Sequence, residues 1–248
     1  ALWYDAKQPS FTSSRYYAPA PPSWLLAHQR KHPVTAHLNY VWRPLDAELL
    51  ARIAGVDKAP GEQTDYPLGA VFPHRLAHAK APASKLKETP KADELLLQVA
   101  LAAFDAEGLG KDATTDLFVV SFSSPDYVGH RWGQESWEMH DELMRLDRRL
   151  AELLDALDGR LGRGRYALLL TSDHGATRMV ERSRAAGRAH ARRVNPDDVH
   201  RVAEAAAAKL LGPGDWIVDE VRTPTLYFKA AVRQQPAARR RGLAKAVA

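Results

Sequence analysis

The feature that most constrains the fold is a strand–helix–strand pattern between Asp116 and Gly175. The apolar runs at 117–122 and 166–170 are rich in aliphatic, β-branched or aromatic residues, which is typical of buried strands. Residues 135–157, which lie between them, carry apolar side chains at helical spacing: Met139, Leu143, Leu146, Leu150, Leu153, Leu154 and Leu157. Two strands joined through a helix are expected to be parallel, with a right-handed crossover. The sequence therefore predicts an α/β fold with a mostly parallel sheet flanked by helices.

Each predicted strand is followed by an aspartate and a histidine. Asp126 and His130 follow the first strand, with Gly129 between them, and Asp173 and His174 follow the second. The carboxyl ends of parallel strands share one edge of a sheet, where open α/β sheets bind ligands, so we expect the four side chains to converge. We interpret the first pair as part of a loop, in which Gly129 gives the tight backbone path that brings its neighbours together.

The residue types at these strand ends indicate a pair of metal ions. Adjacent residues chelate one ion poorly, so two Asp/His pairs favour two ions, typically ~4 Å apart in sites of this kind. Carboxylate oxygen and imidazole nitrogen suit zinc, with manganese or iron as alternatives. The chain has no cysteine, which excludes disulfides and thiolate ligands from within it.

Three motifs resemble the alkaline phosphatase superfamily, and the most similar branch is the type I phosphodiesterase/nucleotide pyrophosphatase-like alkaline phosphatases with a threonine nucleophile. They are Ser123-Ser124-Pro125-Asp126-Tyr127-Val128-Gly129-His130-Arg131-Trp132-Gly133, Arg145-Leu146-Asp147, and Thr171-Ser172-Asp173-His174-Gly175. The opening Ala1-Leu2-Trp3-Tyr4-Asp5 and the pair Thr89-Pro90 are similar to that branch as well. The resemblance thus extends over most of the chain.

This resemblance implies a three-layer α/β sandwich and two Zn²⁺ ions, one held by Asp126 and His130 and the other by Asp173 and His174. It implies in-line hydrolysis of a small-molecule phosphate ester through a covalent phosphoenzyme, and a periplasmic or secreted location. The family's threonine nucleophile, a further aspartate and a third histidine ligand have no counterpart in these 248 residues. We therefore expect an incomplete domain, with the nucleophile outside this segment and its catalytic residues unidentified.

Three alternatives stay open from the sequence. A sulfatase-like hydrolase would need a cysteine or serine that becomes formylglycine, and the chain has no cysteine. A non-catalytic homologue would bind metal or phosphate without turnover. Nucleic-acid binding through the basic tail Arg239–Arg241 is disfavoured, because no aromatic residues interleave with the arginines.

The remaining chain suggests an aromatic-rich cap or insertion region at 1–88 and an α/β metal-binding core at 89–248. No apolar run approaches the ~18 residues that a membrane span needs, and the pattern is silent on oligomeric state. We further expect a hairpin of residues 2–4 and 11–14 and a strand pair at 216–218 and 225–228. Helices are expected to begin near Pro21, Asp46, Thr89 (as a cap) and Asn195. Long loops are expected at 54–88 and 177–193.

Several other polar residues receive a structural interpretation. His74 and His78 have the spacing of a helical metal pair, but we expect them to be solvated or hydrogen bonded. His140 and Asp141 are expected to be exposed or hydrogen bonded on their helix, and Arg178 to lie in a solvated loop.

Overall fold

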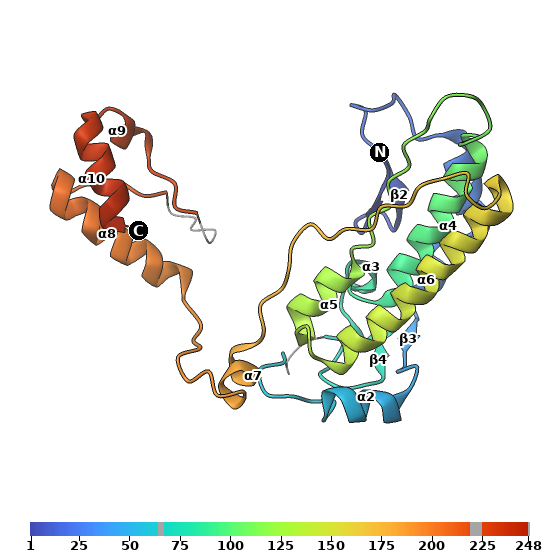
Figure 1. Cartoon of the computed structure of the whole chain (residues 1–248), viewed down its shortest axis with the longest axis horizontal. Helices are drawn as coiled ribbons and strands as arrows, with labels where there is room; N and C mark the ends of the chain where they lie inside the picture. The colour runs from blue at the N-terminus through green and yellow to red at the C-terminus, as the bar shows by residue number, and fades with distance from the viewer. Residues whose placement is uncertain (64–66, 219–224, 248) are drawn as a thin grey trace. The chain divides into compact units, whose positions relative to one another are not determined.

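A computed structural model describes residues 1–63, 67–218 and 225–247, which form two compact units, Ala1–Gly187 and Arg188–Ala248 (Figure 1). The first unit contains β1 (Trp3–Asp5), β2 (Ser10–Thr12), α1 (Ser23–Lys31), the 3₁₀ helix η1 (Val34–His37), β3 (Val41–Trp42), α2 (Ala47–Ala54), β4 (His74–Arg75), the 3₁₀ helix η2 (Leu76–His78), α3 (Pro82–Leu86), α4 (Pro90–Ala106), α5 (Ser124–Trp132), α6 (Trp137–Leu161) and α7 (Val180–Ala185). The second contains α8 (Pro196–Leu211), α9 (Ala230–Arg233) and α10 (Ala237–Val247).

Two short antiparallel sheets build the amino-terminal part of the first unit. Strands β1 and β2 pair with Tyr4 opposite Phe11, which confirms the predicted hairpin. Strands β3 and β4 pair with Trp42 opposite His74, so the region predicted as a loop at 54–88 instead supplies a strand and the helices η2 and α3. The predicted loop was wrong there because two-residue strands carry too little periodicity to be detected.

The long helices α4 and α6 pack side by side (Figure 1). Ser136 caps α6 by accepting a hydrogen bond from the Met139 amide at 3.1 Å, and the helix runs to Leu161, a turn beyond the predicted end. Its buried stripe meets that of α4 in a cluster formed by Leu97, Phe104, Leu153 and Leu157. The predicted helix between the two Asp/His pairs is therefore confirmed.

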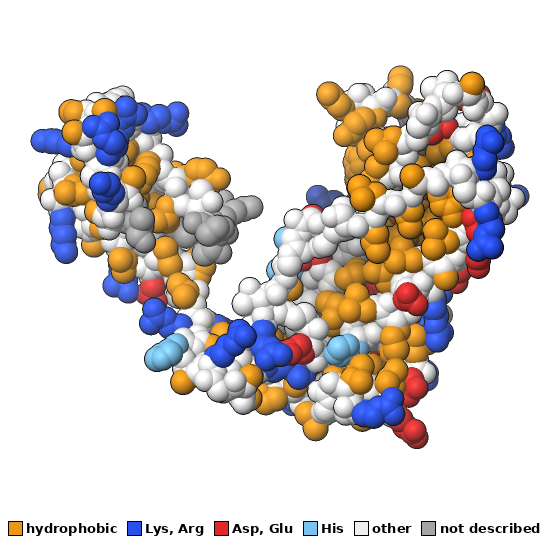
Figure 2. Space-filling view, viewed as in Figure 1, with side chains coloured by type: hydrophobic (Ala, Val, Ile, Leu, Met, Phe, Trp, Pro, Cys, Tyr) orange, Lys and Arg blue, Asp and Glu red, His pale blue; other side chains and the backbone are white. Residues whose placement is uncertain are grey.

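The segments 117–122 and 166–170 are extended, but they form no strand pairing among the described residues. In the first segment, alternate residues pack inward: Phe118 and Phe122 lie against the α4–α6 cluster, whereas Leu117 and Val119 are 90% and 76% exposed. Figure 2 shows apolar side chains gathered over α4 and α6 on this face. The predicted parallel pairing is thus absent here, because a buried strand needs hydrogen-bonded neighbours that these residues do not provide.

An aromatic and polar core fixes the carboxyl end of α5. The rings of Trp42, Phe72 and Trp132 surround the buried His74, with ring centroids 4.6 to 5.4 Å from it. His74 Nδ1 lies 2.9 Å from the Leu68 carbonyl oxygen and its Nε2 lies 2.9 Å from Glu138 Oε1. His74 is therefore a hydrogen-bonded core histidine, as expected, and Trp132 ties α5 to this core.

Two local details differ from expectation. The Thr89 side chain does not cap α4; its hydroxyl donates to the Leu86 carbonyl at 2.7 Å, because that acceptor lies within the same turn. The arginine-rich stretch 177–193 is not all loop, since α7 forms within it.

The second unit is a small helical assembly with its own core. Asn195 caps α8 by accepting from the Asp197 amide at 3.0 Å, as the Asn-Pro-Asp-Asp pattern predicts. Helices α8 and α10 pack through Ala207 and Leu243, and Val232 of α9 completes the cluster. Of the predicted strand pair, a single antiparallel bridge joins Ile217 to Phe228, and residues 219–224 lie outside the described part.

Candidate metal centre

Helix α5 positions the first predicted pair. The region Ser123–His130 is not the loop that we expected: Pro125 occupies the first turn, where a missing amide hydrogen costs nothing, and the helix runs to Trp132. Asp126 and His130 meet because residues four apart share one helix face. Gly129 is an ordinary helical residue. Its lack of a side chain allows close packing, since a Cβ there would lie 3.0 Å from Met139 Cε.

The second pair lies on the extended segment that follows residue 170. His174 Nδ1 is 2.9 Å from the Gly175 carbonyl oxygen, an acceptor, which assigns the ring proton to Nδ1. The lone pair of Nε2 is then free and faces the carboxylates. The Asp173 side chain accepts from the His174 amide at 3.1 Å, and Ser172 Oγ donates to the His174 carbonyl oxygen, so the turn is closed locally.

The two pairs come together around Asp126. Its Oδ1 atom lies 3.4 Å from His130 Nε2 and 3.5 Å from His174 Nε2, while Asp173 Oδ2 lies 3.7 Å from His174 Nε2. All four side chains are open to solvent, from 43% exposed for Asp126 to 88% for Asp173. The predicted convergence of residues from the two separate segments is therefore present.

The arrangement has the donors of a metal centre but not a closed coordination shell. Over residues 1–63, 67–218 and 225–247, no group of three or more His, Cys, Asp and Glu side chains is arranged to hold an ion. The donor chemistry nevertheless fits zinc, because two imidazole nitrogens lie beside carboxylate oxygens at a solvent-accessible position. The Nδ1–H to carbonyl contact of His174 is the kind of outer hydrogen bond that orients a histidine ligand.

Electrostatics at this position favour positive charge. The Gly175 carbonyl, followed by the charges of Asp173 and Asp126, raises the pKa of His174 above its usual value, although partial desolvation opposes the shift. A set of oxygen acceptors that stabilises a protonated imidazole is also one that stabilises a bound cation.

Basic residues around the centre are already engaged. Arg178, three residues beyond Gly175, donates to Glu135 Oε1 at 2.6 Å, so it is not simply solvated. The Lys87 ammonium lies 4.3 Å from the ring centroid of Tyr127, next to Asp126.

Sequence reasoning missed the buried acids beneath α5. Asp93 of α4 and Glu142 of α6 are 3% and 1% exposed, and Asp93 accepts a hydrogen bond from the Ser124 amide at 3.3 Å. Asp141, which we expected to be exposed or hydrogen bonded, is buried and hydrogen bonded. The sequence did carry a signal for their burial, because these acids lie next to the apolar stripes of two amphipathic helices.

The sequence profile described as type I phosphodiesterase / nucleotide pyrophosphatase matches residues 3–233. Because the match covers most of the chain, the protein belongs to this family. The family that the motifs had indicated is thus confirmed.

Two of the similar proteins are alkaline phosphatases. The chain is 35% identical over 179 residues to alkaline phosphatase PhoV of Synechococcus elongatus, covering 71% of this chain and 32% of that protein. It is 32% identical over 193 residues to alkaline phosphatase PafA of Elizabethkingia meningoseptica, covering 73% and 34%. The chain therefore spans about a third of the length of these relatives.

The crystal structure of wild-type PafA matches 99% of this chain with a TM-score of 0.77 and 28% sequence identity, and the match covers 45% of the PafA chain. The α/β alkaline phosphatase fold is therefore shown, over less than half of the length of the PafA chain. Among the described residues, no helix is both long enough and apolar enough to cross a membrane.

Proposed function

We propose that this chain supplies part of the catalytic domain of a two-zinc hydrolase of phosphoric esters. One observation carries the proposal: the carboxylate of Asp126 lies within 3.5 Å of imidazole nitrogens from two segments that are 44 residues apart, His130 and His174. Membership of the phosphodiesterase family and similarity to alkaline phosphatases support the same reaction class.

In this proposal Asp126 and His130 hold one ion, and Asp173 and His174 hold the other. Each ion then has two ligands from this chain, and catalytic zinc sites usually have three, so further ligands come from elsewhere in the polypeptide. Two bound ions would supply Lewis-acid stabilisation of the charge that develops on the attacking and leaving oxygens of the ester.

The chain's own residues fix the geometry of the donors. Gly175 holds His174 in one tautomer through the Nδ1–H contact, so Nε2 keeps its lone pair. Helix α5 carries Asp126 in its first turn and presents His130 from the same face, one turn further along. The nucleophile, a threonine in the proposed mechanism through a covalent phosphoenzyme, lies outside these residues.

Hydrolysis of aryl phosphate monoesters and diesters by the natural-length polypeptide tests the proposal. We expect turnover to depend on zinc and Asp126→Asn to lower it by at least about 100-fold. The reason is that a positioned metal ion stabilises the charge of the transition state by several kcal/mol. Asp147→Asn is the matched control: Asp147 lies exposed on α6 and forms no hydrogen bond or ion pair with the four donors in the described part of the chain, so turnover should change less than about 2-fold.

The outcomes separate the rival functions. Turnover of an aryl sulfate without turnover of the phosphates would replace this function with the sulfatase-like one. Zinc binding without turnover of either ester would support a non-catalytic homologue. Absence of both zinc binding and turnover would refute the metal centre itself.

Three further features of the protein are proposals on the same basis. A division into a cap or insertion region at 1–88 and a metal-binding core at 89–248 predicts that loop changes within the first part alter substrate preference more than metal binding. Manganese or iron could replace zinc at the same oxygen and nitrogen donors. Export to the periplasm or medium is proposed from family membership, and cell fractionation tests it.

A further inference from the structure

Two buried carboxyl groups face each other beneath the amino terminus of α5. Asp93 comes from the first turn of α4 and Glu142 from α6, and they are 3% and 1% exposed. Burial raises the pKa of Asp93 to about 6, and burial followed by the charges of Asp93 and Asp141 raises the pKa of Glu142 well above its usual value. Neither acid touches the metal donors, so the proposed chemistry does not itself explain them.

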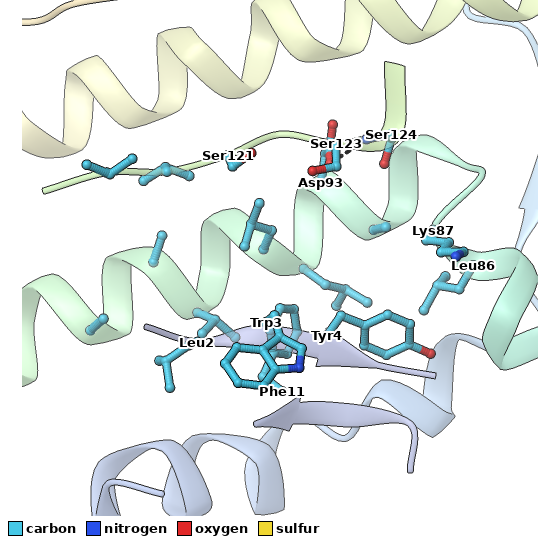
Figure 3. A pocket seen from close by; sticks show the side chains of 18 of the residues that line it. Leu2, Trp3, Tyr4, Phe11, Leu86, Lys87, Asp93, Ser121, Ser123 and Ser124 are labelled. Atoms are coloured by element: carbon cyan, nitrogen blue, oxygen red, sulfur yellow. Dashed lines mark hydrogen bonds between the residues drawn. The ribbon is translucent and has the colours of Figure 1, made fainter. Parts of the chain in front are cut away.

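Asp93 is linked directly to the helix that carries the site. Its Oδ1 atom accepts a hydrogen bond from the amide of Ser124, the first residue of α5, at 3.3 Å. Figure 3 shows Asp93 on α4 directed at Ser123 and Ser124, at the polar end of a cavity of about 470 Å³ whose other walls are largely apolar. Because Ser123 makes no side-chain cap, Asp93 takes the place of a capping residue from another helix.

The surroundings decide which acid carries the proton. Asp93 accepts from a backbone amide and lies at the positive end of the α5 dipole, and both effects favour its ionised form. Glu142 has the charge of Asp141 beside it, and the nearby Arg145 is bound to Asp141 at 2.6 Å. Two buried carboxyl groups this close cannot both ionise at low cost. Asp93 Oδ2 and Glu142 Oε2 are each buried without a hydrogen-bond partner among the described residues, and one proton on Glu142 would satisfy both by donating to Asp93.

We propose that Asp93 and Glu142 are positioning residues for the candidate metal centre: protonated Glu142 orients the Asp93 carboxylate, and Asp93 holds the first turn of α5, from which Asp126 projects. The inference rests on the proposed function, because it assigns these acids a role at the same site. The path from Glu142 to Asp126 runs through the contact between Glu142 and Asp93, the hydrogen bond from the Ser124 amide to Asp93, and about half a turn of helix.

Substitutions at Glu142 test this path in the natural-length polypeptide. Glu142→Gln keeps a neutral hydrogen-bond donor, whereas Glu142→Leu keeps the volume and removes the donor. Leu153→Ala is the control, since it opens a cavity in the same helix within a cluster that includes Leu97 and Phe104 but neither acid. The readouts are the hydrogen-exchange rate of the Ser124 amide relative to amides within α6, measured without metal, and the dissociation constant for zinc.

We expect Glu142→Leu to speed relative exchange at Ser124 about 10-fold and to weaken zinc binding about 10-fold, the lower end of the effect of outer-sphere substitutions. Glu142→Gln and Leu153→Ala should leave both quantities within about 3-fold of the wild type. Equal losses in the Gln and Leu variants, or no loss in either, would overturn the proposal. If wild-type protein binds no zinc, the proposed function fails, whereas exchange at Ser124 still decides whether the acids hold α5.

A measurement on the unsubstituted protein covers the case in which Glu142→Leu does not fold. ¹³C NMR of the side-chain carboxyl carbons at pH 7 should find Glu142 protonated and Asp93 ionised. An ionised Glu142 at that pH would overturn the assignment of the proton and, with it, the proposal.

Discussion

Removing the Asp141 carboxylate should be among the most damaging single changes in the first unit. Asp141 is fully buried in α6, and its two oxygens accept from Trp42 Nε1, the Leu45 amide and Arg145 Nε, each at 2.6 Å. One side chain thereby fastens the segment after β3 to α6, and Arg145 strengthens the link by donating to the Arg43 carbonyl at 2.7 Å.

The magnitude follows from the donors that Asp141→Ala leaves behind. An unsatisfied buried donor costs about 1–3 kcal/mol, which applies to the Trp42 indole and in part to the Leu45 amide. Arg145, whose side chain is 22% exposed, can turn to water, so it adds less than about 1 kcal/mol. The expected loss in unfolding free energy is about 3–4 kcal/mol.

Urea unfolding followed by circular dichroism measures this loss, with Glu152→Ala as the control on the same helix. Glu152 is 51% exposed and, within the described part of the chain, pairs with Arg149 alone at 2.7 Å, so its loss should stay within about 0.5 kcal/mol. A double-mutant cycle with Trp42→Phe should give a coupling energy of about 1–2 kcal/mol. A loss below about 1 kcal/mol, or zero coupling, would refute the reasoning.

Two further predictions concern pH and backbone geometry. Burial raises the pKa of Asp93 from 3.8 in the unfolded chain to about 6, so its stabilising contribution is complete below pH 3.8 and is lost as pH rises through 6. Urea unfolding should therefore show that Asp93→Asn removes about 1 kcal/mol of the fall in unfolding free energy between pH 5 and 7. An unchanged fall would contradict this. Gly133 ends α5 at φ +90° and ψ 158°, a backbone region almost restricted to glycine, and a Cβ there would overlap the Met179 side chain. Gly133→Ala should therefore lower the free energy of unfolding by about 2–3 kcal/mol, measured by thermal or urea unfolding. The helical Gly159 has open space around it, so Gly159→Ala should instead stabilise by up to about 1 kcal/mol, and similar effects at both glycines would contradict the geometric argument.

Local patterns in the sequence predicted local structure well. The apolar spacing of 135–157 indicated α6, and the Asn-Pro-Asp-Asp pattern placed the start of α8 at its observed cap. The proximity of the two Asp/His segments was also predictable, because the helix between them returns the chain to the same end of the unit.

Features that depend on distant contacts were not predictable in this way. Residues 124–132 combine serine, proline and glycine, which favour a loop locally, but burial of Val128 and Trp132 against the core stabilises a helix. The acids of α4 and α6 resemble solvated positions, because nothing in one sequence reveals that Asp93 and Glu142 will face each other. Strand pairing of 117–122 and 166–170 likewise depends on neighbours that a single-sequence pattern does not identify.

In the proposed function four donors form a pair of zinc sites, and metal content tests this most directly. Natural-length protein equilibrated with zinc and then freed of excess should retain two zinc ions per chain by elemental analysis. The His174→Ala variant should retain about one, because it leaves Asp173 as the one remaining donor of its pair, whereas the Asp147→Asn control should retain two. Wild-type protein that retains no zinc, or a His174→Ala variant that retains the full two ions, would contradict the assignment.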